Sequence, residues 1–98
     1  MGYTLSRKAE EDLIAIFLDS AEQFGLPQAE RYHDLLEKAF QFLDDNPWAA
    51  RERHELQPPV RIHPVGSHIV LYTIDEDRDV FVVRVRHGHE DWMAHPGY

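Results

Sequence analysis

The chain has 98 residues, no cysteine and a formal net charge of −8, from 18 acidic and 10 basic residues. A chain of this length has room for one hydrophobic core, so we expect a single domain over residues 1–98. Without cysteine there is no disulfide framework, and no apolar stretch is long enough to predict a membrane span, so we expect a cytoplasmic protein with no membrane partner. We also expect no direct nucleic-acid binding, because affinity for a duplex depends on cations that neutralise phosphates.

The first half of the sequence predicts a short strand at residues 3–5 followed by two amphipathic helices. Ser6 suits the N-cap position, and apolar residues then recur at helical spacing from residue 7 to 24 and again from 29 to 43. Gly25 separates the two helices, and Asn46 precedes a proline, which disfavours further helix. Because the link between them is only two or three residues long, the helices must lie antiparallel.

Each predicted helix carries a second, narrower apolar row. The rows are Ile14, Leu18 and Ala21 in the first helix, and Leu35, Ala39 and Phe42 in the second. We expect most of these residues to pack one helix against the other, and the remainder to offer a hydrophobic landing site for a partner protein. Trp48, in the connector that follows, is expected in the core.

The second half predicts strands at residues 60–63, 68–74 and 80–86, which are rich in β-branched and aromatic residues and separated by turns. The whole chain therefore reads as an α+β domain of order β-α-α-β-β-β, with a helical hairpin packed on one face of a small, antiparallel-rich sheet. Alternation along the last strand places Val82, Arg84 and Arg86 together on the other face. With Arg61, these arginines are suited to bind carboxylates or phosphates.

Several short motifs follow one another in an order that is typical of one family. They are L-S-x-x-A-x-x-D-L-x-x-I from Leu5, F-G at Phe24-Gly25, Pro47, V-L-Y at residues 70–72, and V-R-H-G-H-E-D-W at residues 85–92. Together they resemble the ParE branch of the RelE/ParE toxin superfamily over essentially the entire chain. The resemblance implies a RelE/ParE-like fold and the toxin of a toxin–antitoxin system. It also implies a ParD-like antitoxin as partner in a toxin–antitoxin hetero-oligomer, and inhibition of growth by poisoning DNA gyrase, with no cofactor and no catalysis.

Two sets of contact residues are expected on this basis. The antitoxin is expected to contact Ile14, Leu18, Leu35, Phe42, Arg61, Arg84 and Arg86. The target is expected to contact His87, His89, Asp91 and Trp92, at the start of the C-terminal segment 88–98.

A ribosome-dependent messenger-RNA endonuclease of the RelE type is the alternative function. Its chemistry needs groups that transfer protons and cations that stabilise a charged phosphorane. Glu55, Arg61 and His87 could form such a set, but no lysine follows Lys38. We therefore predict no catalytic residue.

A metal site is a second alternative, because several potential ligands crowd into nine residues near the C-terminus. They are His87, His89, Glu90, Asp91 and His95. Imidazole suits zinc or nickel, yet this spacing matches no named site and no cysteine contributes. We therefore predict no metal.

Overall fold

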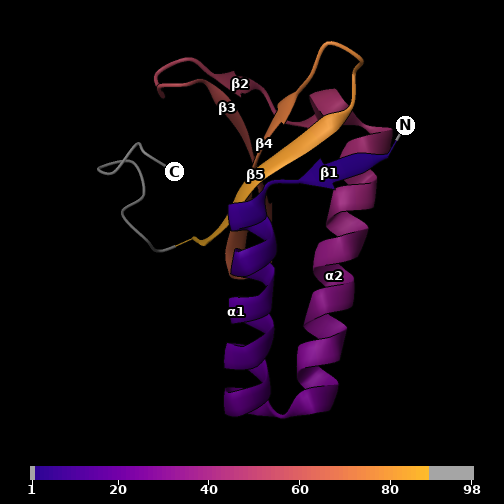
Figure 1. Cartoon of the computed structure of the whole chain (residues 1–98), viewed down its shortest axis with the longest axis vertical. Coiled ribbons are helices and arrows are strands. Elements are labelled where there is room, and N and C mark those ends of the chain that lie inside the picture. The colour runs from indigo at the N-terminus through magenta and orange to yellow at the C-terminus, as the bar shows by residue number, and fades with distance from the viewer. Residues whose placement is uncertain (1, 89–98) are drawn as a thin grey trace.

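In the computed structural model, which describes residues 2–88, two long helices pack against a five-stranded sheet (Figure 1). The elements are β1 (Tyr3–Leu5), α1 (Arg7–Phe24), α2 (Leu26–Asp45), a 3-10 helix η1 (Pro47–Ala49), β2 (Glu52–Arg53), β3 (Val60–Val65), β4 (His68–Ile74) and β5 (Val80–His87). The strand order is β1-β5-β4-β3-β2, in which β1 runs parallel to β5 and the other pairs are antiparallel. The predicted α+β order is confirmed, and η1 and β2 are additions within the connector.

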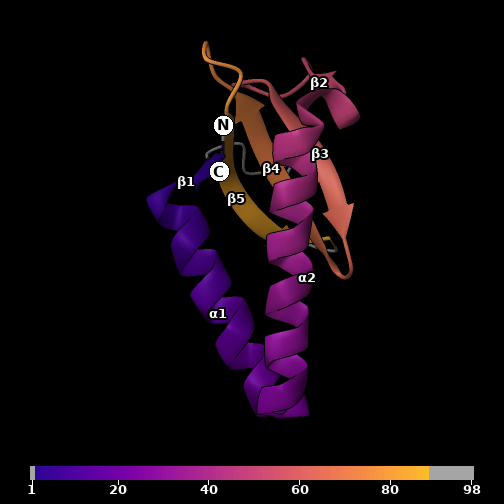
Figure 2. The ribbon, with the colours of Figure 1, turned by 90° about the vertical axis from the view of Figure 1, so that its right-hand side faces the viewer.

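Local chemistry explains where the helices begin and end. The Ser6 hydroxyl oxygen accepts the backbone N–H of Ala9 at 2.9 Å and so caps α1. Gly25 joins the two helices with a φ of +89°, a conformation that costs glycine little because it has no Cβ. The antiparallel helices extend well beyond the sheet (Figure 2). Among residues 2–88, no helix is both long and apolar enough to cross a membrane.

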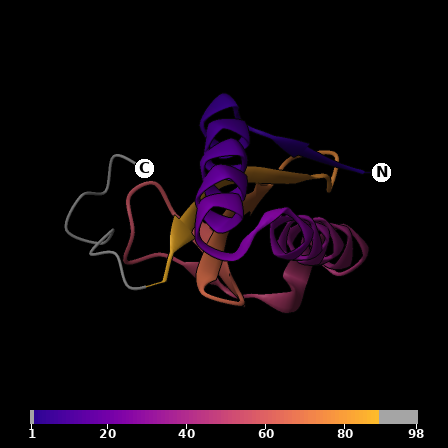
Figure 3. The same ribbon diagram turned by 90° about the horizontal axis from the view of Figure 1, so that it is seen from below.

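The main core lies between the helical hairpin and the sheet, where α1 runs over β5 (Figure 3). Its buried residues come from both helices and from β3, β4 and β5: Ala9, Leu13, Leu36, Phe40, Leu43, Val65, Val70, Tyr72, Val80, Val82 and Val85. A smaller cluster of Leu56, Val60 and Leu71, supported by Ile62 and Ile69, covers the other face of the sheet. Both faces of the sheet therefore bury apolar side chains.

A β-bulge decides which side chains of β5 share a face. The pairing between β4 and β5 passes from Arg84 directly to Val82 and skips Val83. Because the extra residue shifts the alternation, Val82 is fully buried in the main core. The predicted placement of Val82 on the same face as Arg84 and Arg86 was therefore wrong.

The connector after α2 is held by hydrogen bonds to its backbone. The Tyr72 hydroxyl donates to the Pro47 carbonyl at 2.8 Å and accepts the Ala50 N–H at 3.3 Å. Nη1 of Arg61 donates to the Ala50 carbonyl at 2.6 Å. Trp48 lies between the hydrogen-bonded residues Pro47 and Ala50, and its side chain is 58% exposed. Its expected place in the core was wrong, because these hydrogen bonds and the packing of Ala50 on the main core hold the segment without burial of the indole.

The β3–β4 turn depends on Gly66, which has a φ of +56°. A Cβ at this position would lie 2.8 Å from the Tyr32 hydroxyl oxygen and 2.9 Å from its ring. We expect Gly66→Ala to lower the free energy of unfolding by about 1–3 kcal/mol, since it combines backbone strain with overlap. Urea unfolding measures this change. Ser67→Ala is the matched control, because it keeps the backbone N–H that Tyr32 accepts; an equal loss in both variants would contradict the explanation.

Candidate functional site

An apolar groove follows the outer seam between α1 and α2. It is lined by Leu13, Ile14, Phe17, Leu18 and His33, and we call it the helical groove. Ile14 is 61% exposed and Leu18 is 60% exposed, so the expected packing of one helix on the other does not bury them. Fully burying one such side chain against a partner favours association by roughly 1.5–3 kcal/mol. The groove is therefore suited to bind a protein.

Leu35 and Phe42 belong to a different surface. Phe42 lies nine residues after His33, which is two and a half helical turns, so the two side chains leave α2 on opposite sides. The Phe42 ring stacks on His63 of β3 with a centroid separation of 5.5 Å, and burial lowers the pKa of His63. Phe42 and the exposed Trp48 line one hollow. We call Leu35, Phe42 and Trp48 the Phe42 patch; the four apolar residues predicted as one site thus form two.

The three predicted arginines are also divided between the two faces of the sheet. Arg61 lies on the helix-facing side, as its register with the buried Tyr72 shows. Arg84 and Arg86 lie on the opposite face beside the smaller apolar cluster. They project from the same side, as predicted, but Arg61 does not join them.

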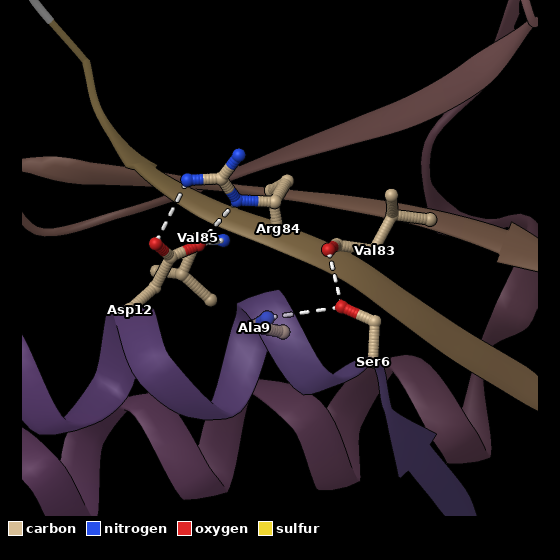
Figure 4. Close-up of polar contacts among 6 residues, drawn as sticks. All are labelled: Ser6, Ala9, Asp12, Val83, Arg84 and Val85. Atoms are coloured by element: carbon tan, nitrogen blue, oxygen red, sulfur yellow. Dashed lines mark hydrogen bonds and ion pairs between the residues drawn. The ribbon is translucent and has the colours of Figure 1, made fainter. Parts of the chain in front are cut away.

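Arg84 is bound by Asp12 of α1. Its Nε and Nη2 atoms donate to the two carboxylate oxygens at 2.7 and 2.9 Å, and the same carboxylate accepts the Val85 N–H at 3.0 Å (Figure 4). The side chains of Asp12 and Arg84 are only 16% and 18% exposed. The Ser6 hydroxyl donates to the Val83 carbonyl at 2.6 Å. Asp12 of α1 and its N-cap Ser6 therefore hydrogen-bond to the backbone of β5 past the end of β1. Arg84 has a structural role whatever else it contacts.

His87 lies at the end of β5, in a polar cluster that the sequence did not indicate. Its ring is 5.2 Å from that of His68, and His68 Nδ1 lies 2.6 Å from the Tyr32 hydroxyl. Burial raises the pKa of Tyr32. These three residues and Asp19 line a pocket between the helices and the β3–β4 turn. The other predicted target contacts, His89, Asp91 and Trp92, lie outside the described residues, as do Glu90 and His95 of the alternative metal site.

The residues of the alternative nuclease set do not converge. Arg61 and His87 pair with residues of β4 that are four positions apart, which is about 13 Å along the strand. Glu55 lies in the loop after β2, where a hydrogen bond from Arg53 at 2.7 Å lowers the pKa of its carboxyl group. Acid–base catalysis needs its groups within hydrogen-bonding reach of one substrate, and these three are not so arranged.

Among residues 2–88, one group of three potential metal ligands lies together, at Asp75, Asp77 and Asp79 in the β4–β5 turn. Oδ1 of Asp75 accepts the backbone N–H groups of the other two residues at 2.9 Å. This pattern accounts for the shape of the turn without an ion.

Comparisons with known proteins cover most of the chain. Residues 3–92 match the family model described as the ParE toxin of the type II toxin–antitoxin system parDE. The chain is 30% identical to Toxin ParE1 of Caulobacter vibrioides over 95 residues, 97% of each chain, and 33% identical to Toxin ParE1 of Mycobacterium tuberculosis H37Rv over 89 residues, 91% of each. A solved structure titled "Chromosomal ParDE TA system from P. aeruginosa" has a TM-score of 0.75 at 19% identity, covering 89% of this chain and 95% of that one, so it shares the fold. The chain therefore belongs to the ParE family of toxins of type II toxin–antitoxin systems.

Proposed function

We propose that this toxin arrests growth in the cytoplasm by binding and poisoning DNA gyrase, and that a ParD-like antitoxin neutralises it in a hetero-oligomer. The proposed action is binding without catalysis. The observation that most supports it is the helical groove, where two adjacent aliphatic side chains are about 60% exposed in a small domain. Contiguous exposed apolar surface of this kind marks protein–protein contacts. Membership of the ParE family supports the choice of partners.

The proposed antitoxin contacts are the seven residues predicted from the sequence. Ile14 and Leu18 lie in the helical groove, and Leu35 and Phe42 lie on the other side of α2. An antitoxin that covers both surfaces must therefore wrap around α2. Arg61, Arg84 and Arg86 remain proposed contacts on the two sheet faces, and an antitoxin carboxylate at Arg84 would meet a guanidinium that Asp12 already holds.

The proposed target-binding region is His87 with the C-terminal residues 88–98, including His89, Asp91 and Trp92. His87 is half-buried beside His68, at the end of the last strand. It therefore lies where β5 passes into that segment. Aromatic side chains such as Trp92 often anchor interfaces, which supports the assignment.

Induction of the chain in cells without antitoxin is expected to arrest growth, with filamentation and a DNA-damage response. Purified gyrase incubated with the toxin is expected to accumulate cleaved DNA. Co-expression of the antitoxin should restore growth. Removal of residues 88–98 should abolish the arrest, because three of the four proposed target contacts, His89, Asp91 and Trp92, are lost. Circular dichroism of the truncated chain is the control for folding.

Transcript mapping in the same cells separates gyrase poisoning from the nuclease alternative. Messenger RNA cut on ribosomes, with that cutting lost in His87→Ala, would show a ribonuclease and overturn the proposal. Circular dichroism of His87→Ala is the control for folding. Intact transcripts with damaged DNA are the expected result.

A further inference from the structure

Acidic residues border the helical groove at both ends of its α1 side. Glu10 lies four residues before Ile14, and Glu22 lies four residues after Leu18. Residues four apart are neighbours on one helical face, so the exposed apolar ridge begins and ends with a carboxylate. Both glutamates are exposed.

The α2 side of the groove is acidic as well. Glu30 and Glu37 lie three residues before and four residues after His33, and both are exposed. Glu37 Oε1 is 3.2 Å from His33 Nε2. The groove is thus an apolar strip with carboxylates along both helices.

Basic residues do not cancel this charge. The segment 7–45 contains ten acidic and four basic residues, a net charge of −6. Arg31 and Lys38 are two and five residues from His33, so their side chains leave α2 about 160° and 140° away from that of His33. Arg7 lies on the groove side of α1, where its Nε is 3.9 Å from a carboxylate oxygen of Glu11.

We infer that the helical groove receives an amphipathic helix that is apolar on its inner face and carries lysine or arginine on both flanks. The inference rests on the proposed function, because this helix belongs to the antitoxin. The ridge from Glu10 to Glu22 spans about 18 Å, the length of a helix of about 12 residues. A partner with acidic flanks would meet carboxylates on both sides of the groove, which disfavours the complex.

The shape of the groove selects a helix over an extended strand. Its walls are two antiparallel helices whose interior backbone N–H and C=O groups are already hydrogen-bonded within each helix, so no edge is available for strand addition. Side chains of a third helix can pack between the ridges of α1 and α2. The partner's apolar residues therefore recur at three- and four-residue spacing.

The test is calorimetric titration of the cognate antitoxin into the full-length toxin and into the double variant Glu10→Gln, Glu22→Gln. Glutamine keeps the size and helix propensity of glutamate and removes only charge. We expect the double variant to bind about threefold to twentyfold more weakly, with a smaller loss of affinity as salt is raised. Glu76→Gln, in the β4–β5 turn, removes one exposed charge outside the hairpin and is expected to leave the affinity unchanged.

Two synthetic helical peptides with identical apolar positions test the groove without the antitoxin. One has lysine on both flanks and the other has glutamate, and fluorescence anisotropy is expected to show binding of the lysine peptide alone. Equal binding of both peptides, or a double variant that binds the antitoxin as tightly as the parent or more tightly, overturns the inference and leaves the proposed function standing. A toxin that neither arrests growth nor binds its antitoxin, yet binds the lysine peptide, overturns the proposed function instead.

Discussion

Asp12→Ala is expected to lower the free energy of unfolding by about 3 kcal/mol and the melting temperature by roughly 12–24 °C. The Asp12 carboxylate accepts two hydrogen bonds from Arg84 and one from the Val85 backbone, and it is only 16% exposed. Its removal takes the acceptor from a largely buried guanidinium and from the Val85 N–H, which lies on β5 past the end of β1. Removing one partner of a buried ion pair is costly because the other partner stays buried without its hydrogen bonds. Thermal and urea unfolding, followed by circular dichroism, measure the change.

Asp19→Ala is the matched control for this prediction. Asp19 lies on the same helix but is exposed, so the substitution brings the same gain in helix propensity without loss of the Arg84 contact. We expect its stability to stay within about 0.5 kcal/mol of the parent. Equal stability of the two variants would show that the Asp12–Arg84 pair contributes nothing to the attachment of α1 to β5.

The double variant Ile14→Ala, Leu18→Ala is expected to weaken antitoxin binding by about 30-fold to 1000-fold, or roughly 2–4 kcal/mol. Both side chains are about 60% exposed in the free toxin, so their truncation removes contact with the partner and little of the core. Alanine also keeps the helix intact. Calorimetric titration gives the affinity, and the melting temperature of the free toxin shows that the fold is unchanged.

The corresponding pair on the other side of α2, Leu35→Ala with Phe42→Ala, shows how far the antitoxin extends. Both side chains are 45% exposed, and the Phe42 ring stacks on His63. A loss of affinity from both pairs is expected of an antitoxin that wraps around α2. Unchanged affinity of the Ile14 and Leu18 variant would rule out the helical groove as the antitoxin site.

Because Arg84 is paired with Asp12, replacing it with glutamate does not test antitoxin binding alone. Arg84→Glu would place a second carboxylate beside Asp12 in a largely buried position, so weaker antitoxin binding could follow from unfolding alone. The sequence showed two arginines on one face of a strand and did not show that one of them was bound to a helix 72 positions away. Contacts of this kind depend on packing, which local patterns do not encode.

The candidate site was predictable in part. The second apolar row was expected to pack mostly between the helices and only in part to offer a landing site for a partner, whereas Ile14 and Leu18 of this row are exposed. The sequence did not predict that Leu35 and Phe42 lie on a separate surface, because this depends on how α2 is rotated about its axis against the sheet. His33 completes the helical groove although nothing in its local sequence marks it.

The sequence by itself determined the element order, the capped start of α1, the glycine link between the helices and the strand turns, because these follow from backbone preferences of neighbouring residues. Only the tertiary structure decided that a bulge buries Val82, that Trp48 is exposed, and that Asp12 closes the edge of β5. Each of these outcomes depends on whether contacts between segments distant in the sequence are more favourable than exposure of the same groups to water. Such a balance exists only after the hairpin and the sheet have come together.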